Sequence, residues 1–227
     1  MSEERFLTKA DLAEHVLPKF MVVEGPIGVG KTTLCKMLAE CFQSDTLLER
    51  AEENPFLDRF YAGEKNAALS TQLFFLMQRA QQINALKQDD LFAPTKTADF
   101  LLEKDRLFAE VILDDDELNL YLQVYEHLTI DTPTPNLVVY LQAPSSVLME
   151  RIQRRGIRSE QSISRQYLDR LNDAYSHFFH YYDESPLLIV NASDIDWVNN
   201  PKDFNSLVRY MLSIKNGRHY YNPQPAL

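Results

Sequence analysis

Cysteine and basic charge are both scarce in this sequence. Its 227 residues include two cysteines, Cys35 and Cys41, whose spacing fits neither a metal-binding motif nor a disulfide framework. A chain of this kind suits a reducing compartment, so we expect a cytoplasmic protein. Lysine and arginine total 23 against 33 aspartate and glutamate residues, a net charge of −10. This balance argues against a nucleic-acid partner, because binding to phosphate backbones requires clustered positive charge.

Long apolar runs are missing as well. No stretch approaches the ~18 consecutive apolar residues that a transmembrane helix requires, so we expect no membrane partner. Linkers, repeats and low-complexity segments are also missing. We therefore expect one domain over residues 1–227, with residues 1–18 and 217–227 loosely held at its ends.

Glycine is sparse too, with six in the chain, yet residues 25–32 read GPIGVGKT and match the pattern GxxxxGKT. The backbone N–H groups of such a loop surround a polyphosphate, and the following helix N-terminus adds positive dipole. A purely structural glycine turn is the alternative, which the strand-like and helix-like flanks disfavour. Lys31 is expected to reach the β- and γ-phosphates, and Thr32 to bind Mg²⁺. The residues expected to contact ATP are Gly25, Pro26, Ile27, Gly28, Val29, Gly30, Lys31, Thr32 and Thr33.

Apolar segments of strand length alternate with helical patterns along the chain. The strand-like segments cover residues 20–24, 46–49, 96–101, 137–142 and 187–191. Continuous apolar runs suit strands that are buried on both faces, as in a parallel sheet. We therefore predict an α/β fold of the P-loop NTPase type, with a five-stranded parallel sheet flanked by helices and an arginine-rich lid.

Two long amphipathic helices are predicted, over residues 66–87 and 162–183. Ser162 has the residue type of an N-cap for the second of these helices. The aromatic stripe along that helix indicates core or a subunit interface rather than a cofactor site.

Polar residues in three further segments suggest a second half of the site. Glu49 ends a strand-like segment, where a carboxylate would face the γ-phosphate and accept a proton from an attacking hydroxyl. Gln72 and Arg79 lie seven residues apart in an apolar helix, so they share one face. Four arginines and a glycine lie within residues 151–158, which suits an anion-binding lid with a hinge. A solvated basic helix end is the alternative interpretation of that cluster.

The segments EGPIGVGKTTL, NPFLDRFY, EKDRLFA and RIQRRG, in this order, resemble those of the deoxynucleoside kinase family, in particular the bacterial deoxyadenosine/deoxyguanosine kinases. The resemblance covers residues 18–197. It implies Mg²⁺-dependent transfer of the ATP γ-phosphate to the 5′-hydroxyl of a deoxynucleoside, for nucleotide salvage. It also implies a homodimer that pairs through long helices.

The resemblance assigns roles on the acceptor side of the site. Glu49 matches the general base on the 5′-hydroxyl, while Tyr61 and Glu160 match the pair that holds the 3′-hydroxyl of the sugar. Gln72 matches the residue that hydrogen-bonds the base. The intervals of eleven residues from Tyr61 to Gln72 and of seven from Gln72 to Arg79 agree with the family's spacing.

Arg79 and Asp105 match a pair that members preferring purines or deoxycytidine place beside the base. Thymidine-preferring members generally lack this pair. We therefore expect a preference for deoxyadenosine or deoxyguanosine, with deoxycytidine as a further candidate.

On the donor side, Arg151 and Arg155 match lid arginines that grip the transferring phosphoryl group, with Arg158 beside them. Asp194 lies where the family's donor-base loop is found. The expected catalytic residues are Glu49, Lys31 and Arg155.

One position departs from the family's pattern. Animal members have an acidic-Arg-Ser triplet after the third strand, where this chain has Asp99-Phe100-Leu101. Asp99 can still act near Mg²⁺, but Phe100 cannot replace an arginine that orients the 5′-hydroxyl and steadies the base. Other bacterial members are also aromatic there, so the residue that takes over the arginine's role stays open.

Two other functions stay open at this stage. A nucleoside-monophosphate kinase, such as a thymidylate kinase, shares the P-loop and the lid but needs basic residues to hold the acceptor's own phosphate. A non-catalytic nucleotide-binding regulatory module would typically need a base-reading motif or a partner surface, and the sequence offers neither.

Overall fold

The computed structural model describes residues 5–64, 66–88, 95–128 and 132–223. Within these ranges, six strands form one parallel sheet in the order β2-β3-β1-β4-β5-β6. The strands are β1 (Phe20–Glu24), β2 (Asp45–Leu47), β3 (Lys96–Ala98), β4 (Leu137–Gln142), β5 (Leu187–Asn191) and β6 (Arg218–Tyr221). Three of them, β1, β4 and β5, have the predicted bounds, while β2 and β3 are shorter than predicted.

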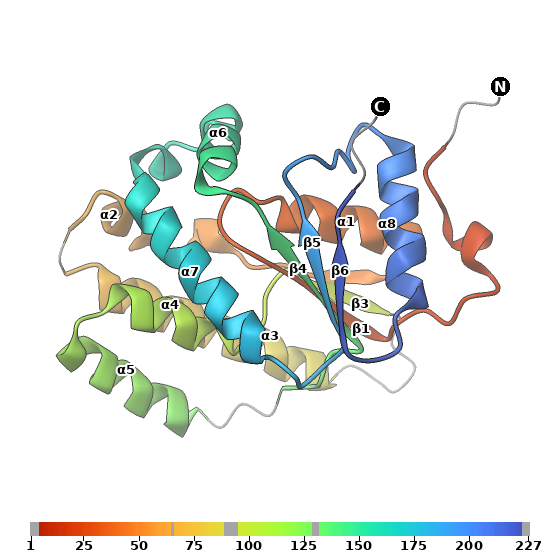
Figure 1. The fold of residues 1–227 in the computed structure, drawn as a ribbon. Helices are drawn as coiled ribbons and strands as arrows, with labels where there is room; N and C mark the ends of the chain where they lie inside the picture. The colour runs from red at the N-terminus through yellow and green to blue at the C-terminus, as the bar shows by residue number, and fades with distance from the viewer. Residues whose placement is uncertain (1–4, 65, 89–94, 129–131, 224–227) are drawn as a thin grey trace.

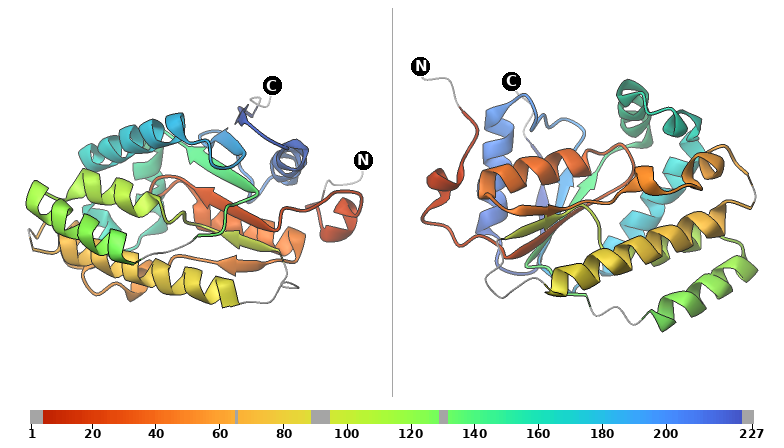
Figure 2. Two further views of the ribbon diagram at one scale, coloured as in Figure 1. Left: turned by 90° about the horizontal axis from the view of Figure 1, so that it is seen from below. Right: turned by 180° about the vertical axis from the view of Figure 1, so that it is seen from behind.

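Helices cover both sides of this sheet. They are α1 (Lys31–Phe42), α2 (Leu57–Tyr61), α3 (Ala68–Gln88), α4 (Lys104–Ile112), α5 (Asp115–His127), α6 (Ser145–Arg155), α7 (Arg165–Tyr181) and α8 (Pro201–Ser213), with short 3₁₀ turns η1 (Lys9–Leu12), η2 (Ala51–Glu53) and η3 (Ser159–Ser162). Helices α1 and α8 lie on one side of the sheet, and α3, α4, α5 and α7 lie on the other (Figures 1 and 2). This arrangement confirms the predicted α/β architecture. Among the described helices, none is both long and apolar enough to cross a bilayer.

The strand register brings the polar segments together. Val22 of β1 lies opposite Ala98 of β3 and Val138 of β4, and these residues are fully buried. Because all the strands are parallel, the residues that follow β1, β2 and β3 meet at one edge of the sheet. That edge is where the P-loop and the predicted acceptor residues lie.

The sheet has six strands rather than the predicted five. The additional strand, β6, pairs in parallel with β5, so that Tyr220 lies opposite Ile189. It belongs to residues 217–227, which we expected to be loosely held. Its side chains alternate between exposed and half-buried at the sheet edge, so it lacks the continuous apolar run by which the inner strands were recognised.

Helix α7 begins two residues later than its predicted cap implied. The N-cap is Ser164 rather than Ser162, since the Ser164 hydroxyl accepts a hydrogen bond from the Tyr167 N–H at 3.1 Å. Ser162 lies in η3 instead. The aromatic stripe of α7 packs in the main core between the helices and the sheet, so it is core rather than a subunit interface. A second, smaller apolar cluster consists of Leu76, Ile83, Phe100, Leu102, Ala109 and Tyr121.

Candidate active site

The loop between β1 and α1 has the backbone that its glycines predict. Gly25, Gly28 and Gly30 have φ angles of 149°, 83° and 106°, which side-chain-bearing residues rarely adopt. A Cβ atom at Gly28 would lie 2.8 Å from Cγ1 of Ile152 on α6, and one at Gly30 would lie 2.9 Å from Cζ2 of Trp197. Helix α6 and the loop after β5 therefore pack directly against the P-loop.

Lys31 is the first residue of α1 and folds back over the P-loop. Its Nζ atom donates hydrogen bonds to the carbonyl oxygens of Gly25 at 2.7 Å and Pro26 at 3.3 Å. Burial, together with the nearby Lys104 ammonium, lowers the pKa of Lys31 to about 8. A buried cation beside a helix N-terminus is suited to binding a phosphate anion.

Asp99 connects the P-loop to the segment after β2. Its Oδ2 atom accepts a hydrogen bond from the Thr32 hydroxyl at 2.5 Å, and its Oδ1 atom accepts one from the backbone N–H of Glu49 at 2.7 Å. Burial raises the pKa of Asp99, and the bond from Thr32 opposes that rise. The Asp99 carboxylate thereby fixes the position of the Thr32 hydroxyl relative to the Glu49 backbone.

Arg79 of α3 forms ion pairs with two carboxylates, those of Glu49 and Asp105. Its side chain is only 4% exposed, and burial lowers its pKa to about 10. The guanidinium also lies 5.2 Å from the ring centre of Phe75 and 5.8 Å from that of Phe100. Phe100, in the loop after β3, thus packs against a guanidinium from α3 instead of supplying one.

A second buried ion pair lies beside this one, and the sequence analysis missed it. The Nζ atom of Lys104, the first residue of α4, lies 3.3 Å from Oε1 of Glu24 and 3.7 Å from Oε1 of Glu49. Glu24 is fully buried and also accepts hydrogen bonds from the Leu101 N–H at 2.8 Å and the Tyr175 hydroxyl at 3.0 Å.

Of these residues, Glu49, Arg79, Asp99 and Lys104 border a cavity of about 170 Å³. Seven of its lining residues were expected to act on the acceptor or the transferred group: Lys31, Glu49, Tyr61, Gln72, Arg79, Arg155 and Glu160. Asp105 is fully buried and pairs with Arg79, but it is not among the described residues that line this cavity.

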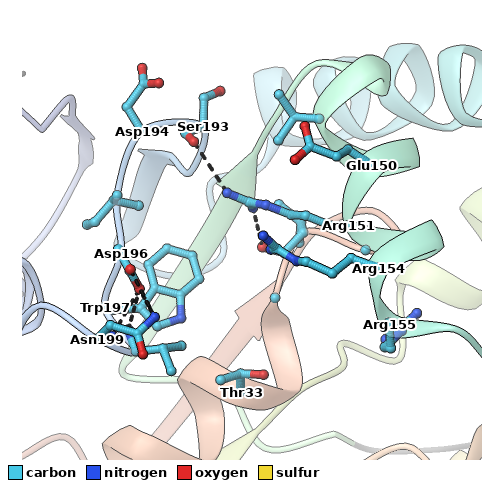
Figure 3. A pocket seen from close by; sticks show the side chains of 16 residues that line it. Thr33, Glu150, Arg151, Arg154, Arg155, Ser193, Asp194, Asp196, Trp197 and Asn199 are labelled. Carbon is cyan, nitrogen blue, oxygen red and sulfur yellow. Dashed lines mark hydrogen bonds between the residues drawn. The ribbon is translucent and has the colours of Figure 1, made fainter.

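A larger cavity of about 770 Å³ lies between the P-loop, α6 and the loop after β5 (Figure 3). Arg151, Arg154 and Arg155 border it from α6, and Asp194 and Trp197 border it from that loop. Arg155 and the P-loop residue Gly28 line both cavities, so the two cavities adjoin.

Arg151 ties the lid helix to the rest of the site. Its guanidinium donates hydrogen bonds to the carbonyl oxygens of Val29 at 3.1 Å, Ala192 at 2.7 Å and Ser193 at 3.3 Å. Figure 3 shows the bond toward Ser193. Arg151 therefore joins α6, the P-loop and the loop after β5 through backbone contacts.

Arg155 forms an ion pair with Glu160 of η3, and this pair closes the lid over the smaller cavity. Helix α6 ends at Arg155, and its C-cap Gly156 has a φ of +70°, a left-handed conformation that glycine adopts readily. Tyr61 lies close to Glu160, and burial raises the pKa of Tyr61 well above its usual value. Arg158 is exposed and lines neither cavity within the part of the chain that the structure describes.

Known proteins resemble this chain along most of its length. Residues 21–214 match the family model described as deoxynucleoside kinase. Deoxyguanosine kinase of Bacillus subtilis (strain 168) is 34% identical over 197 residues, which cover 85% of this chain and 95% of that protein. The deoxyadenosine/deoxycytidine kinase of the same organism is 26% identical over 213 residues, with coverage of 89% and 97%.

A solved structure of deoxyadenosine kinase from M. mycoides, with the products dCMP and dCDP bound, has a TM-score of 0.73 to this chain at 24% identity. The matched region covers 86% of this chain and 98% of the M. mycoides chain. This likeness shows that the two proteins share a fold. From the family match and the relatives, the chain belongs to the deoxynucleoside kinase family, and it is a phosphotransferase that uses a nucleotide as phosphate donor.

Proposed function

We propose that this protein transfers the γ-phosphoryl group of ATP to the 5′-hydroxyl of a deoxynucleoside in nucleotide salvage, with purine deoxynucleosides preferred. The observation that supports this most strongly is the pair of adjoining cavities at one edge of the sheet. One is bordered by the P-loop and the lid arginines, the other by Glu49, and Arg155 lines both.

The larger cavity is the ATP site in this proposal. P-loop N–H groups and Lys31 bind the phosphates, while the loop containing Asp194 and Trp197 lies beside the donor base. Arg151 holds this cavity in shape, and Arg155 neutralises charge that develops on the transferring group.

Mg²⁺ fits the oxygen donors that are present. The Thr32 hydroxyl and the Asp99 carboxylate lie within 2.5 Å of each other, and Mg²⁺ typically combines one or two carboxylates with substrate phosphates. Thr32 and Asp99 would hold the ion, which when bound supplies charge neutralisation on the phosphates.

On the acceptor side, Glu49 takes the proton from the 5′-hydroxyl. The hydroxyl oxygen then forms a bond to the γ-phosphorus as the bond from that phosphorus to the ADP oxygen breaks. Tyr61 and Glu160 hold the 3′-hydroxyl of the sugar; both line the smaller cavity next to Arg155. Positioning and preorganised charge are the main sources of such catalysis.

Base selection is assigned to Gln72, Arg79 and Asp105. Donors and acceptors of this kind can pair with adenine, guanine or cytosine, and hydrogen-bonded sites discriminate strongly between base edges. The two Bacillus subtilis relatives are named for deoxyguanosine and for deoxyadenosine and deoxycytidine. We infer a preference for deoxyadenosine or deoxyguanosine, with deoxycytidine as a weaker acceptor.

A nucleoside-monophosphate kinase is the main rival, since a thymidylate kinase of Leptospira interrogans is 29% identical over 70% of this chain. Such an enzyme needs free cations for the acceptor's phosphate. Of the cations that line the smaller cavity, Arg79, Lys104 and Arg155 are paired with carboxylates, and Lys31, which bonds to P-loop carbonyl oxygens, is assigned to the ATP phosphates. This pairing favours an uncharged acceptor.

Our proposal includes a cytoplasmic homodimer. Both cysteines are free and buried, which suits a reducing compartment. Since the aromatic stripe of α7 is core, the better candidates for a dimer face are α3 and α5, where Met77 and Leu120 are 47% and 49% exposed. Light scattering of the purified protein measures the oligomeric state.

The reaction itself is tested by incubating the purified protein with ATP, Mg²⁺ and deoxyadenosine or deoxyguanosine, and locating the new phosphate by ³¹P NMR. Phosphate on the 5′-oxygen supports the proposal. Binding of ATP without transfer to any nucleoside would favour a regulatory module instead.

A further inference from the structure

Lys104 is buried at an electrostatically unfavourable place. It is the first residue of α4, where the helix dipole is already positive, and its side chain is 3% exposed. Burial lowers the pKa of Lys104 to about 8. A cation in this position requires strong partners, because removing it from water is costly.

Those partners belong to the active site. The ammonium lies 3.3 Å from Oε1 of Glu24 at the end of β1 and 3.7 Å from Oε1 of Glu49 after β2. The other charged groups close to it are Arg79 on α3, Asp99 after β3 and Lys31 at the start of α1. Lys104 and Arg79 thus share the same carboxylate oxygen of Glu49.

Glu24 holds Lys104 in place from the opposite side. Its two carboxylate oxygens accept hydrogen bonds from the N–H groups of Gly25 and Leu101 and from the Tyr175 hydroxyl. Because two backbone N–H groups and a hydroxyl hold the Glu24 carboxylate, it is a rigid anchor for Lys104. The Lys104 ammonium is therefore directed to a fixed point beside Glu49.

The residue at position 100 does not reach this point. Phe100 is 3% exposed in the second apolar cluster and is not among the described residues that line the smaller cavity. Lys104 does line that cavity. A cation is therefore present on the acceptor side even though position 100 is aromatic.

We propose that Lys104 is a positioning residue for Glu49, and that its ammonium supplies beside Glu49 a positive charge that the aromatic residue at position 100 does not supply. It keeps the Glu49 carboxylate turned toward the acceptor, so that Arg79 is able to leave Glu49 for the base. The proposal rests on the proposed function, in which Glu49 is the general base.

Kinetics of Lys104→Met and Lys104→Arg test this role. With the charge removed, we expect kcat to fall about 10- to 100-fold while the KM for ATP stays unchanged, because misplacing a reacting group has effects of this size. The acidic limb of the kcat–pH profile should move to higher pH, since a neighbouring cation favours ionised Glu49. Lys104→Arg should restore both, and the exposed α1 variant Lys36→Met should behave as wild type.

Lys104→Met leaves Glu24 buried without its cation and risks misfolding. The double variant Glu24→Gln/Lys104→Met removes both charges, so no unpaired charge is left buried and the role of Lys104 can be tested in a folded protein. Its melting temperature and circular dichroism establish that it is folded. Its kcat and acidic limb should still resemble those expected for Lys104→Met.

A titration of the Glu49 carboxyl by ¹³C NMR separates this proposal from the proposed function. The Glu49 signal is assigned by its loss in Glu49→Gln, and its midpoint should rise by about one pH unit in the Lys104 variants. If wild type phosphorylates no nucleoside, the proposed function fails, yet this titration still decides the role of Lys104. An unchanged Glu49 midpoint, or a folded double variant with wild-type kcat and acidic limb, would overturn the proposal.

Discussion

The Thr32 hydroxyl donates a 2.5 Å hydrogen bond to one oxygen of the Asp99 carboxylate. The other oxygen of Asp99 accepts the backbone N–H of Glu49 at 2.7 Å. One carboxylate after β3 therefore joins the P-loop to the residue proposed as the general base. The Asp99 side chain therefore aligns the donor and acceptor halves of the site. The sequence analysis had assigned Asp99 a role only near Mg²⁺.

Asp99→Asn should lower kcat by about 100-fold, since loss of one preorganised charged group commonly has this effect. The amide offers a single acceptor oxygen and no charge, so it cannot accept from both the Thr32 hydroxyl and the Glu49 N–H. Steady-state kinetics at saturating ATP measure the change. Asp173→Asn, a matched change at an exposed position of α7, should leave kcat intact. Wild-type turnover in Asp99→Asn would show that Asp99 aligns nothing of importance.

Glu49→Gln should lose about 10²–10⁴-fold in kcat, the usual range for a general base. ATP binding should persist, because Glu49 lies in the smaller cavity and not in the larger one. Calorimetric titration with an ATP analogue, beside the kinetics, checks both statements. Near-normal turnover of Glu49→Gln would show that Glu49 is not the general base.

Arg155→Met should slow phosphoryl transfer by about 10²–10³-fold, equivalent to about 3–4 kcal/mol of barrier. The reason is that Arg155 lines both cavities, where charge on the transferring group develops. Single-turnover experiments isolate that step. Arg170→Met, at an exposed position of α7, provides the control and should be indistinguishable from wild type. Equal effects of the two changes would point to general loss of charge instead.

Raising the pH through about 8 should lower kcat at saturating ATP. Burial lowers the pKa of Lys104 to about 8, so the ammonium beside Glu49 is present below that pH and lost above it. Lys31 has a similarly lowered pKa, but bound phosphate keeps it protonated. In Lys104→Arg the side chain stays charged, and the decline should begin at higher pH. If the kcat–pH profiles of wild type and Lys104→Arg coincide, the charge at position 104 does not contribute to turnover.

Much of the fold could be predicted because its inner strands are continuous apolar runs. Strands β1, β4 and β5 are buried on both faces and have the predicted bounds. The edge strand β6 has no such run, although the Asn216-Gly217 pair directly before it is a turn signal. The cap of α7 was misplaced by two residues because two serines precede the helix, and only hydrogen-bond geometry distinguishes them.

The site was partly predictable for a different reason. The P-loop is contiguous in the sequence, and the segments with Arg79 and Asp105 could be matched to a family. The pairing of Glu24 with Lys104 joins two residues 80 positions apart; both lie in segments that carry the family resemblance, but neither was given a role there. Contacts of that kind arise from the parallel register at the sheet edge, which residue patterns do not specify.

The most direct test of the central claim is a side-by-side measurement of kcat/KM for the four deoxynucleosides and for dTMP with ATP and Mg²⁺. The account predicts the highest values for deoxyadenosine or deoxyguanosine, a lower value for deoxycytidine, and the lowest values for thymidine and dTMP. A preference for dTMP would contradict it, because the acceptor half would then be built for a phosphate and not for an uncharged sugar.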